Sequence, residues 1–78
     1  MPAKNVVVYT APGCSVCKAE IEFLSQRNID FTEKNIRTDL DAMQEMVEIN
    51  SQSTPTTVID GEVFIGFDKE RISEKLGL

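Results

Sequence analysis

Cys14 and Cys17 are the residues whose types and spacing indicate a chemistry most directly. They are the chain's two cysteines, they are separated by two residues, and the sequence contains no histidine. Two cysteines three positions apart on the first turn of a helix lie on the same side of it and can close a disulfide with little backbone movement. One thiolate can then attack a disulfide while the other resolves the mixed disulfide, with no general base required.

The two cysteines are expected to differ in reactivity. Cys14 follows the break at Pro12 and Gly13 and falls at the start of a predicted helix. Unpaired backbone N–H groups and the helix dipole lower the pKa of a thiol there from about 8.5 to roughly 3.5–7.5, and Lys18 can add to this effect. Cys17 lies a turn deeper, so we expect it to be less exposed and less acidic. We therefore predict that Cys14 is the nucleophile and Cys17 the resolving thiol.

Two other uses of the cysteine pair are weighed against redox chemistry. One is an inert buried pair, and the other is half of a zinc site shared across a dimer. Because the chain has no histidine, imidazole catalysis and a zinc site of one cysteine pair plus histidines are excluded. We predict no metal site and no resident cofactor.

Composition and charge restrict the classes of partner. The 78 residues are enough for a single domain over 1–78, and 41% of them are hydrophobic. Thirteen acidic against eight basic residues give a net charge of −5, which argues against nucleic acid as a partner because phosphates need a basic face. The apolar run Val6–Tyr9 is too short for a signal peptide or a membrane span. The sequence therefore predicts a soluble cytoplasmic protein with no membrane partner.

Apolar periodicity and turn residues predict seven elements. Strands are expected over 5–9, 31–36, 56–59 and 62–65, and helices over 15–27, over 39–50 and from Asp68 to Gly77. Asp60-Gly61 between the last two strands is a strong hairpin signal. The order β-α-β-α-β-β-α predicts an α/β fold with a mixed four-stranded sheet and three helices.

Apolar residues recur at helical spacing in the predicted helices and indicate the face toward the core, although Val16, with Pro12 and Phe67, is also expected to offer an apolar contact to a docking protein. In the first helix these are Val16, Ala19, Phe23 and Leu24, while Glu20 is assigned to the polar positions. In the second helix Leu40, Met43 and Val47 follow the same helical spacing. Pro55, at the entrance to the third strand, reads from the sequence alone as a strand terminator.

Three ordered motifs cover essentially the whole chain: Tyr9–Cys17, Ser53-Thr54-Pro55 and Ile65-Gly66-Phe67-Asp68. With these motifs the sequence resembles the glutaredoxin family, and especially the glutaredoxin-like NrdH-redoxin group. The resemblance implies a thioredoxin-like fold with a cis Pro55 that faces the cysteine pair. It also implies that the Thr54 backbone pairs with the bound thiol compound or peptide, and that Gly66, Phe67 and Asp68 form the far wall of the groove.

The resemblance also implies a function. We expect a monomeric electron carrier that reduces protein disulfides, with ribonucleotide reductase as the implied partner and a thioredoxin-reductase-like flavoprotein or another low-potential reductase as the donor. Two alternatives from the same family are an iron–sulfur cluster carrier that works as a dimer and a glutathione-dependent glutaredoxin. A third alternative is an interaction module that uses no thiol.

The sequence departs from the family where glutathione would bind. Glutathione-using members place a basic residue before the first cysteine and another on or after the central helix, whereas this chain has Ala11 and Pro12 in the loop. It has no lysine or arginine between Arg37 and Lys69. Gln52 still offers glutathione a neutral contact, and Asp68 offers a contact to the ammonium group of glutathione. We therefore expect glutathione to be held weakly, opposed by the acidic residues of that interval: Asp39, Asp41, Glu45, Glu48, Asp60, Glu62 and Asp68.

Overall fold

The computed structural model describes residues 5–51 and 53–78. Its elements occur in the predicted order, with boundaries that shift by at most two residues. They are β1 (Val6–Thr10), α1 (Ser15–Gln26), β2 (Thr32–Asn35), α2 (Leu40–Glu48), β3 (Thr56–Ile59), β4 (Glu62–Ile65) and α3 (Lys69–Leu76). In the part of the chain described, no helix is long and apolar enough to cross a membrane.

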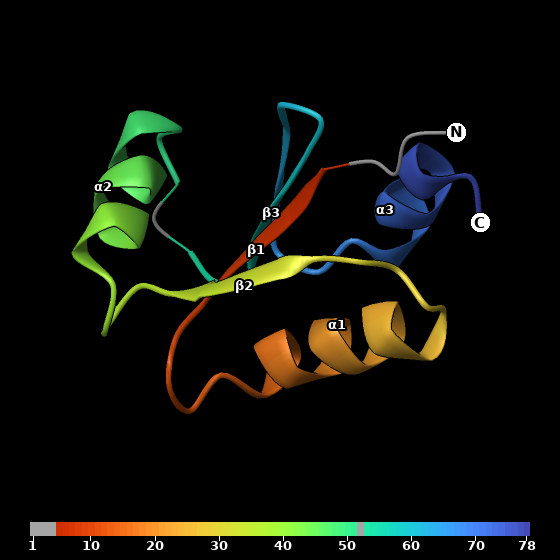
Figure 1. The fold of residues 1–78 in the computed structure, drawn as a ribbon, viewed down its shortest axis with the longest axis horizontal. Coiled ribbons are helices and arrows are strands. Elements are labelled where there is room, and N and C mark those ends of the chain that lie inside the picture. The colour runs from red at the N-terminus through yellow and green to blue at the C-terminus, as the bar shows by residue number, and fades with distance from the viewer. Residues whose placement is uncertain (1–4, 52) are drawn as a thin grey trace.

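The four strands form one mixed sheet in the order β2-β1-β3-β4 (Figure 1). Strands β1 and β2 are parallel, with Val8 opposite Glu33, while β3 runs antiparallel to both β1 and β4. Helix α1 is the crossover between the two parallel strands, since parallel neighbours need such a connection. This topology confirms the predicted thioredoxin-like fold.

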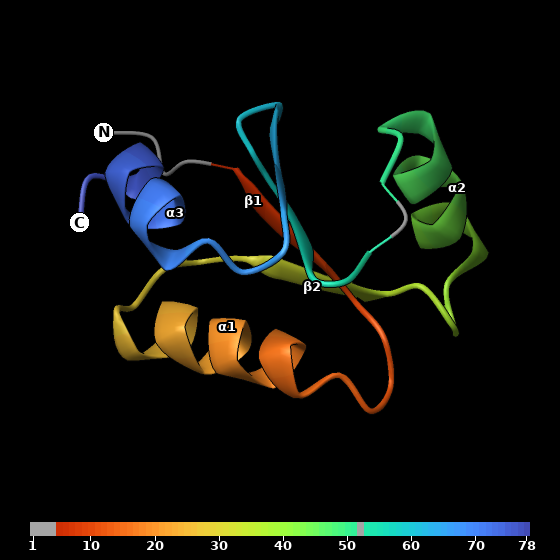
Figure 2. The same cartoon turned by 180° about the vertical axis from the view of Figure 1, so that it is seen from behind.

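Side chains of β1 alternate between two apolar layers. Val6 and Val8 belong to a core cluster with residues of α1 and α3, whereas Tyr9 belongs to a second cluster with residues of α2. Successive residues of a strand point to opposite faces, so α1 and α3 cover one face of the sheet and α2 covers the other. Figure 2 shows from behind that α2 and α3 lie well apart, on either side of the strands.

The predicted hairpin turn and the predicted end of the last helix are present, whereas α2 is capped by Asp39 and not by Thr38, the residue that the sequence favours. Asp60 and Gly61 both have positive φ, of 50° and 88°, as a two-residue hairpin turn of this kind requires. The Asp39 side chain accepts hydrogen bonds from the backbone N–H groups of Asp41 and Ala42 at the start of α2. Gly77 ends α3 in the left-handed conformation.

The buried face of α1 differs from the prediction. Val16 and Ala19 are exposed, whereas Cys17 and Glu20 are buried together with Phe23 and Leu24. The helix is rotated so that a cysteine and a carboxylate, rather than two small apolar residues, share the interface with the sheet. The assignment of Glu20 to a solvent-facing position was therefore wrong.

The buried face of α2 also differs from the prediction. Leu40 is 83% exposed and Val47 is 68% exposed, and Met43 is exposed as well. Ala42 and Met46, one helical turn apart, are the α2 residues packed against Tyr9. Helix α2 carries apolar residues on two sides, so its periodicity alone did not identify which side meets the sheet.

Candidate active site

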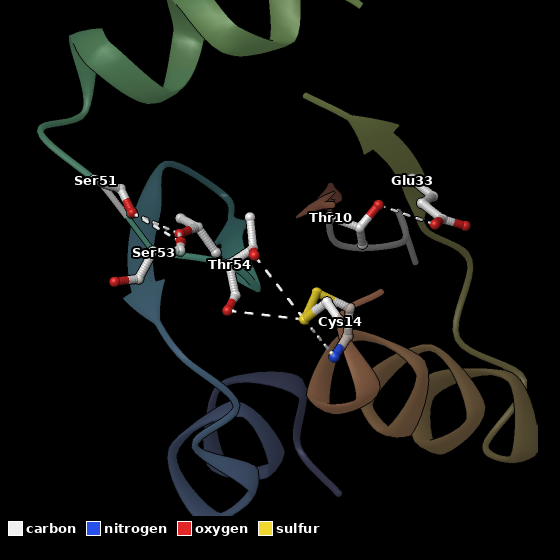
Figure 3. Close-up of a disulfide and its surroundings, with 8 residues drawn as sticks. Thr10, Cys14, Glu33, Ser51, Ser53 and Thr54 are labelled. Carbon is white, nitrogen blue, oxygen red and sulfur yellow. Dashed lines mark hydrogen bonds between the residues drawn. A yellow bond between two sulfur atoms is a disulfide. The ribbon is translucent and has the colours of Figure 1, made fainter. Parts of the chain in front are cut away.

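Cys14 and Cys17 form a disulfide at the start of α1, with their Cα atoms 5.2 Å apart. Cys14 is the N-cap residue of this helix, and its Sγ accepts a hydrogen bond of 3.1 Å from the backbone N–H of Cys17 (Figure 3). An N-cap acceptor satisfies one of the donors that the first turn of a helix leaves without an intrahelical partner. The sulfur of Cys14 therefore stands where a negative charge is stabilised.

The two sulfurs sit in different environments. Cys17 is 3% exposed, on the face of α1 that packs against the sheet, while Cys14 is partly exposed at the end of the loop from β1. The predicted difference in exposure is confirmed. An incoming thiolate reaches Cys14 more readily than Cys17.

Thr54 is the residue from outside the β1–α1 segment that approaches Cys14. Its hydroxyl Oγ1 and its carbonyl oxygen each lie 3.9 Å from Cys14 Sγ (Figure 3). The Thr54–Pro55 peptide bond is cis, as the resemblance implied. The structure thus brings the second motif of the sequence against the first.

The loop that carries Thr54 is held by hydroxyl groups. Ser51 Oγ and Thr56 Oγ1, both buried, are 2.6 Å apart, and Thr56 Oγ1 also donates to the Ser53 carbonyl over 2.5 Å. These contacts anchor the loop at the end of α2 and at the start of β3 (Figure 3).

Of the third motif, Gly66 is hydrogen-bonded to Pro55. The backbone N–H of Gly66 donates to the Pro55 carbonyl over 2.8 Å. The Phe67 ring packs instead on the ring of Phe23, with centroids 5.6 Å apart, at the edge of the main core. Asp68 caps α3 by accepting from the Arg71 backbone N–H. The structure therefore joins Gly66 to the Thr54–Pro55 loop, while Phe67 contacts α1 and Asp68 caps α3.

A cavity of about 490 Å³ opens on the other side of the disulfide, between the β1–α1 loop and β2. At its wall, the Thr10 hydroxyl donates to the Glu33 carboxylate over 3.0 Å. The charged side chains in its walls are Lys18, Glu22 and Glu33. The full set of lining residues is Thr10, Ala11, Pro12, Gly13, Cys14, Cys17, Lys18, Ile21, Glu22, Glu33 and Asn35.

Comparison with known proteins agrees with this geometry. The glutaredoxin family model matches residues 6–64. The chain belongs to the glutaredoxin family. It is therefore a thiol–disulfide oxidoreductase with a Cys-x-x-Cys pair.

Named relatives of this glutaredoxin are of similar length. It is 36% identical to a glutaredoxin-like 8.6 kDa protein from the rubredoxin operon of Clostridium pasteurianum, over 88% of this chain and 93% of that protein. It is 28% identical to the glutaredoxin-like protein NrdH of Lactococcus lactis, over 88% of this chain and 96% of NrdH. The crystal structure of the thioredoxin-like protein BC3987 superposes with a TM-score of 0.89 at 38% identity, covering 92% of this chain and all of that one.

Two of the acidic residues between Arg37 and Lys69 are paired with lysines. Lys34 forms an ion pair of 2.9 Å with Glu45, and Lys75 forms one of 3.1 Å with Glu62. The Tyr9 hydroxyl also donates to Glu45 over 2.6 Å. Hydrogen bonds from Tyr9 and Lys34 hold the pKa of the Glu45 carboxyl below its ordinary value.

These ion pairs reduce the negative charge expected between Arg37 and Lys69. The carboxylates that line the cavity at the disulfide are Glu22 and Glu33, which lie outside that interval. Gln52, considered above as a glutathione contact, lies outside the described residues.

Sequence reasoning missed one buried polar pair in this glutaredoxin. Glu20 and Thr57 are both fully buried, and the Thr57 hydroxyl donates a short hydrogen bond to Glu20 Oε2. The sequence feature that indicates the burial of Glu20 is its spacing, three residues after Cys17 and four before Leu24, which places all three residues on one helical face. Two polar residues facing each other from separate elements leave no periodic trace in the sequence.

Proposed function

We propose that this glutaredoxin is a dithiol electron carrier that reduces protein disulfides, with Cys14 as nucleophile and Cys17 as resolving thiol. The observation that carries the proposal is the hydrogen bond of 3.1 Å from the Cys17 backbone N–H to Cys14 Sγ at the start of α1. That donor and the helix dipole stabilise a thiolate on Cys14 in the reduced protein. The burial of Cys17 supports its resolving role, because an external disulfide does not reach it first.

The reaction transfers two electrons in two exchanges. The Cys14 thiolate attacks one sulfur of the substrate disulfide, whose S–S bond breaks as the first substrate thiolate leaves and takes a proton from solvent. The Cys17 sulfur, having lost its proton, then attacks Cys14 Sγ and expels the second substrate thiolate. The substrate ends as a dithiol and the protein as the Cys14–Cys17 disulfide seen in the structure.

Substrate positioning falls to the Thr54–Pro55 loop. The Thr54 carbonyl and hydroxyl stand 3.9 Å from Cys14 Sγ, so a peptide that brings its sulfur to Cys14 passes beside Thr54. In this proposal the Thr54 backbone pairs with the peptide next to the attacked cysteine, while the Pro55 side chain is buried and leaves that contact to Thr54. Gly66, Phe67 and Asp68 bound the groove on the α3 side, with Gly66 hydrogen-bonded to Pro55.

The partners in this proposal follow from the NrdH relationship and from charge. The chain is a cytoplasmic monomer with one glutaredoxin-like domain over 1–78. It takes electrons from a thioredoxin-reductase-like protein and carries them to ribonucleotide reductase. Support comes from the 28% identity to NrdH and from Glu22 and Glu33 beside the disulfide. These carboxylates oppose the two carboxylates of glutathione, though exposed charges are screened over about 10 Å at 0.1 M salt.

Turnover with two donor systems tests the choice of donor. Oxidised protein is supplied either with glutathione and glutathione reductase or with a thioredoxin reductase, and NADPH oxidation is followed at physiological salt. We expect efficient turnover with the thioredoxin reductase and lower catalytic efficiency with glutathione. Efficient turnover with glutathione alone would assign the protein to the glutathione-dependent class. A brown protein after anaerobic purification would instead indicate a cluster carrier.

A further inference from the structure

Glu20 is a carboxyl group inside the protein core. Its side chain is 0% exposed, and Oε2 accepts the hydrogen bond from Thr57 on β3. The other oxygen, Oε1, is buried and has no hydrogen-bond partner within residues 5–51 and 53–78. Buried side-chain polar atoms normally have at least one hydrogen-bond partner, so the unpartnered oxygen of Glu20 calls for an explanation.

Glu20 lies one helical turn after Cys17 on the same face of α1. Residues three apart on a helix are neighbours, and helical side chains lean toward the N-terminal turn. Glu20 and Cys17 are therefore neighbours on the face of α1 that is buried against the sheet. Thr57, its partner, is two residues after Pro55 on the central strand β3.

The surroundings favour the neutral form of this carboxyl group. Thr57 lies opposite Val8 on β1 and Phe64 on β4, two buried apolar residues of the same sheet face. Burial raises the pKa of Glu20, and the Thr57 hydrogen bond offsets this only partly. Burying a neutral carboxyl group with one unpartnered oxygen costs much less free energy than burying a carboxylate in the same place.

The charged groups of the neighbouring elements are exposed or engaged elsewhere. On α1, Lys18 and Glu22 are exposed, and on β2 Glu33 accepts from Thr10. Basic groups of α1 and α3 lie over aromatic rings at 4.4–5.4 Å: Arg27 and Lys69 over Phe23, and Arg71 over Phe64. Cys17 is thus the titratable group that shares the buried face of α1 with Glu20 once the disulfide opens.

Redox chemistry at Cys17 needs a proton inside the core. When a donor thiolate attacks Cys14 and the disulfide breaks, the electron pair goes to Cys17 Sγ, a thiolate sealed from solvent. A buried thiolate is disfavoured unless it is protonated or paired. In the reverse step the Cys17 thiol must lose that proton before it attacks Cys14.

We infer that Glu20 exchanges this proton with Cys17, an inference that rests on the dithiol function proposed above. On reduction, the Glu20 carboxyl proton moves to the Cys17 thiolate, which leaves a Glu20 carboxylate and a Cys17 thiol. On substrate turnover, the Cys17 proton returns to Glu20 and the Cys17 thiolate attacks Cys14 Sγ. The mixed disulfide then breaks, and its electron pair leaves on the substrate sulfur, which is protonated by solvent. In the reduced protein the two groups share one proton and titrate as a pair.

The resolving step can be measured by itself with 5,5′-dithiobis(2-nitrobenzoate) as the probe disulfide. One equivalent added to reduced protein releases a first thionitrobenzoate as Cys14 forms the mixed disulfide, and a second as Cys17 resolves it. We expect Glu20→Gln to slow the second phase about 100-fold near neutral pH, the low end of what a positioned acid or base contributes. The first phase should be unchanged. The control Glu70→Gln, on the exposed surface of α3 and away from the cavity at the disulfide, should leave both phases unchanged.

Thr57→Val separates proton exchange from a structural role. Loss of the hydroxyl removes a hydrogen bond that lowers the pKa of Glu20, so the midpoint of the second phase should move to higher pH. An unchanged second-phase rate and pH profile in Glu20→Gln would overturn the inference. If Glu20→Gln does not fold, an unchanged midpoint in Thr57→Val overturns it. Loss of the first phase in Cys17→Ser rather than in Cys14→Ser would instead contradict the proposed roles of the cysteines, so the two failures are distinguishable.

Discussion

The backbone N–H of Cys17 donates a hydrogen bond of 3.1 Å to Cys14 Sγ. Cys14 is the N-cap residue of α1, and its side chain accepts from the backbone N–H three residues later, which is that of Cys17. Because this donor remains when the disulfide is reduced, it continues to favour negative charge on Cys14.

Titration of the two thiols in the reduced protein should show this asymmetry. We expect the Cys14 thiol to lose its proton within roughly pH 3.5–7.5, the range of thiols at helix N-termini, and the buried Cys17 thiol to lose it at higher pH. The measurement is thiolate absorbance against pH in Cys17→Ser and Cys14→Ser, each of which retains one thiol. A more acidic thiol in the variant that retains Cys17 would reverse the assignment.

Glu20 should make the stability of the protein depend on pH. Its folded-state pKa is raised above 4.5, so the native state holds the proton over a pH range in which the unfolded chain has lost it. Its contribution is fully present below pH 4.5 and is lost as pH rises through the folded-state pKa. We expect the free energy of unfolding of the wild type to fall relative to that of Glu20→Gln as pH rises above 4.5. Urea denaturation of oxidised protein at several pH values measures this, and parallel curves for the two proteins would contradict it.

The two methionines of α2 provide a matched test of which face is buried. Met46 is 2% exposed and Met43 is 43% exposed. Met46→Ala should lower the free energy of unfolding by about 2–5 kcal/mol, as for other buried large-to-small changes. Met43→Ala should change it by about 0.5 kcal/mol or less. Equal losses in urea denaturation would show that α2 is rotated relative to the structure.

Tyr9 is the single tyrosine of the chain, so its ionisation can be followed by phenolate absorbance. Burial, and then the Glu45 carboxylate that accepts its hydrogen bond, raises the pKa of Tyr9 to about 12. This raised pKa contributes stability that is present below pH 10.0 and is lost as pH rises through about 12. Glu45→Gln should move the phenolate transition toward 10.0. A wild-type transition already at that value would contradict the Tyr9–Glu45 contact.

Local signals in the sequence were sufficient for the order of elements and for the three motifs. The hairpin at Asp60-Gly61 and the cap at Asp68 depend on neighbouring residues alone, and both were predicted where the structure has them. The cap of α2 is Asp39, one residue after the predicted Thr38. The cis Thr54–Pro55 bond came from the family resemblance, because no local rule separates it from a strand terminator.

The rotation of the helices could not be predicted in the same way. Helix α2 has two apolar sides, one with Leu40 and Val47 and one with Ala42 and Met46. The second side packs against the sheet, in the cluster that contains Tyr9. The burial of Glu20 depends on Thr57, 37 residues further along the chain. Contacts of this kind are set by tertiary packing, which outweighs the polarity of a single residue.

Trapping of a substrate protein by single-cysteine variants tests the central claim most directly. Reduced Cys17→Ser and reduced Cys14→Ser are each mixed with oxidised ribonucleotide reductase, and the products are separated under non-reducing conditions. The account predicts a stable mixed disulfide through Cys14 in the Cys17→Ser variant and none in the Cys14→Ser variant. A mixed disulfide formed by Cys14→Ser, with none formed by Cys17→Ser, would contradict the assignment of Cys14 as the attacking thiol.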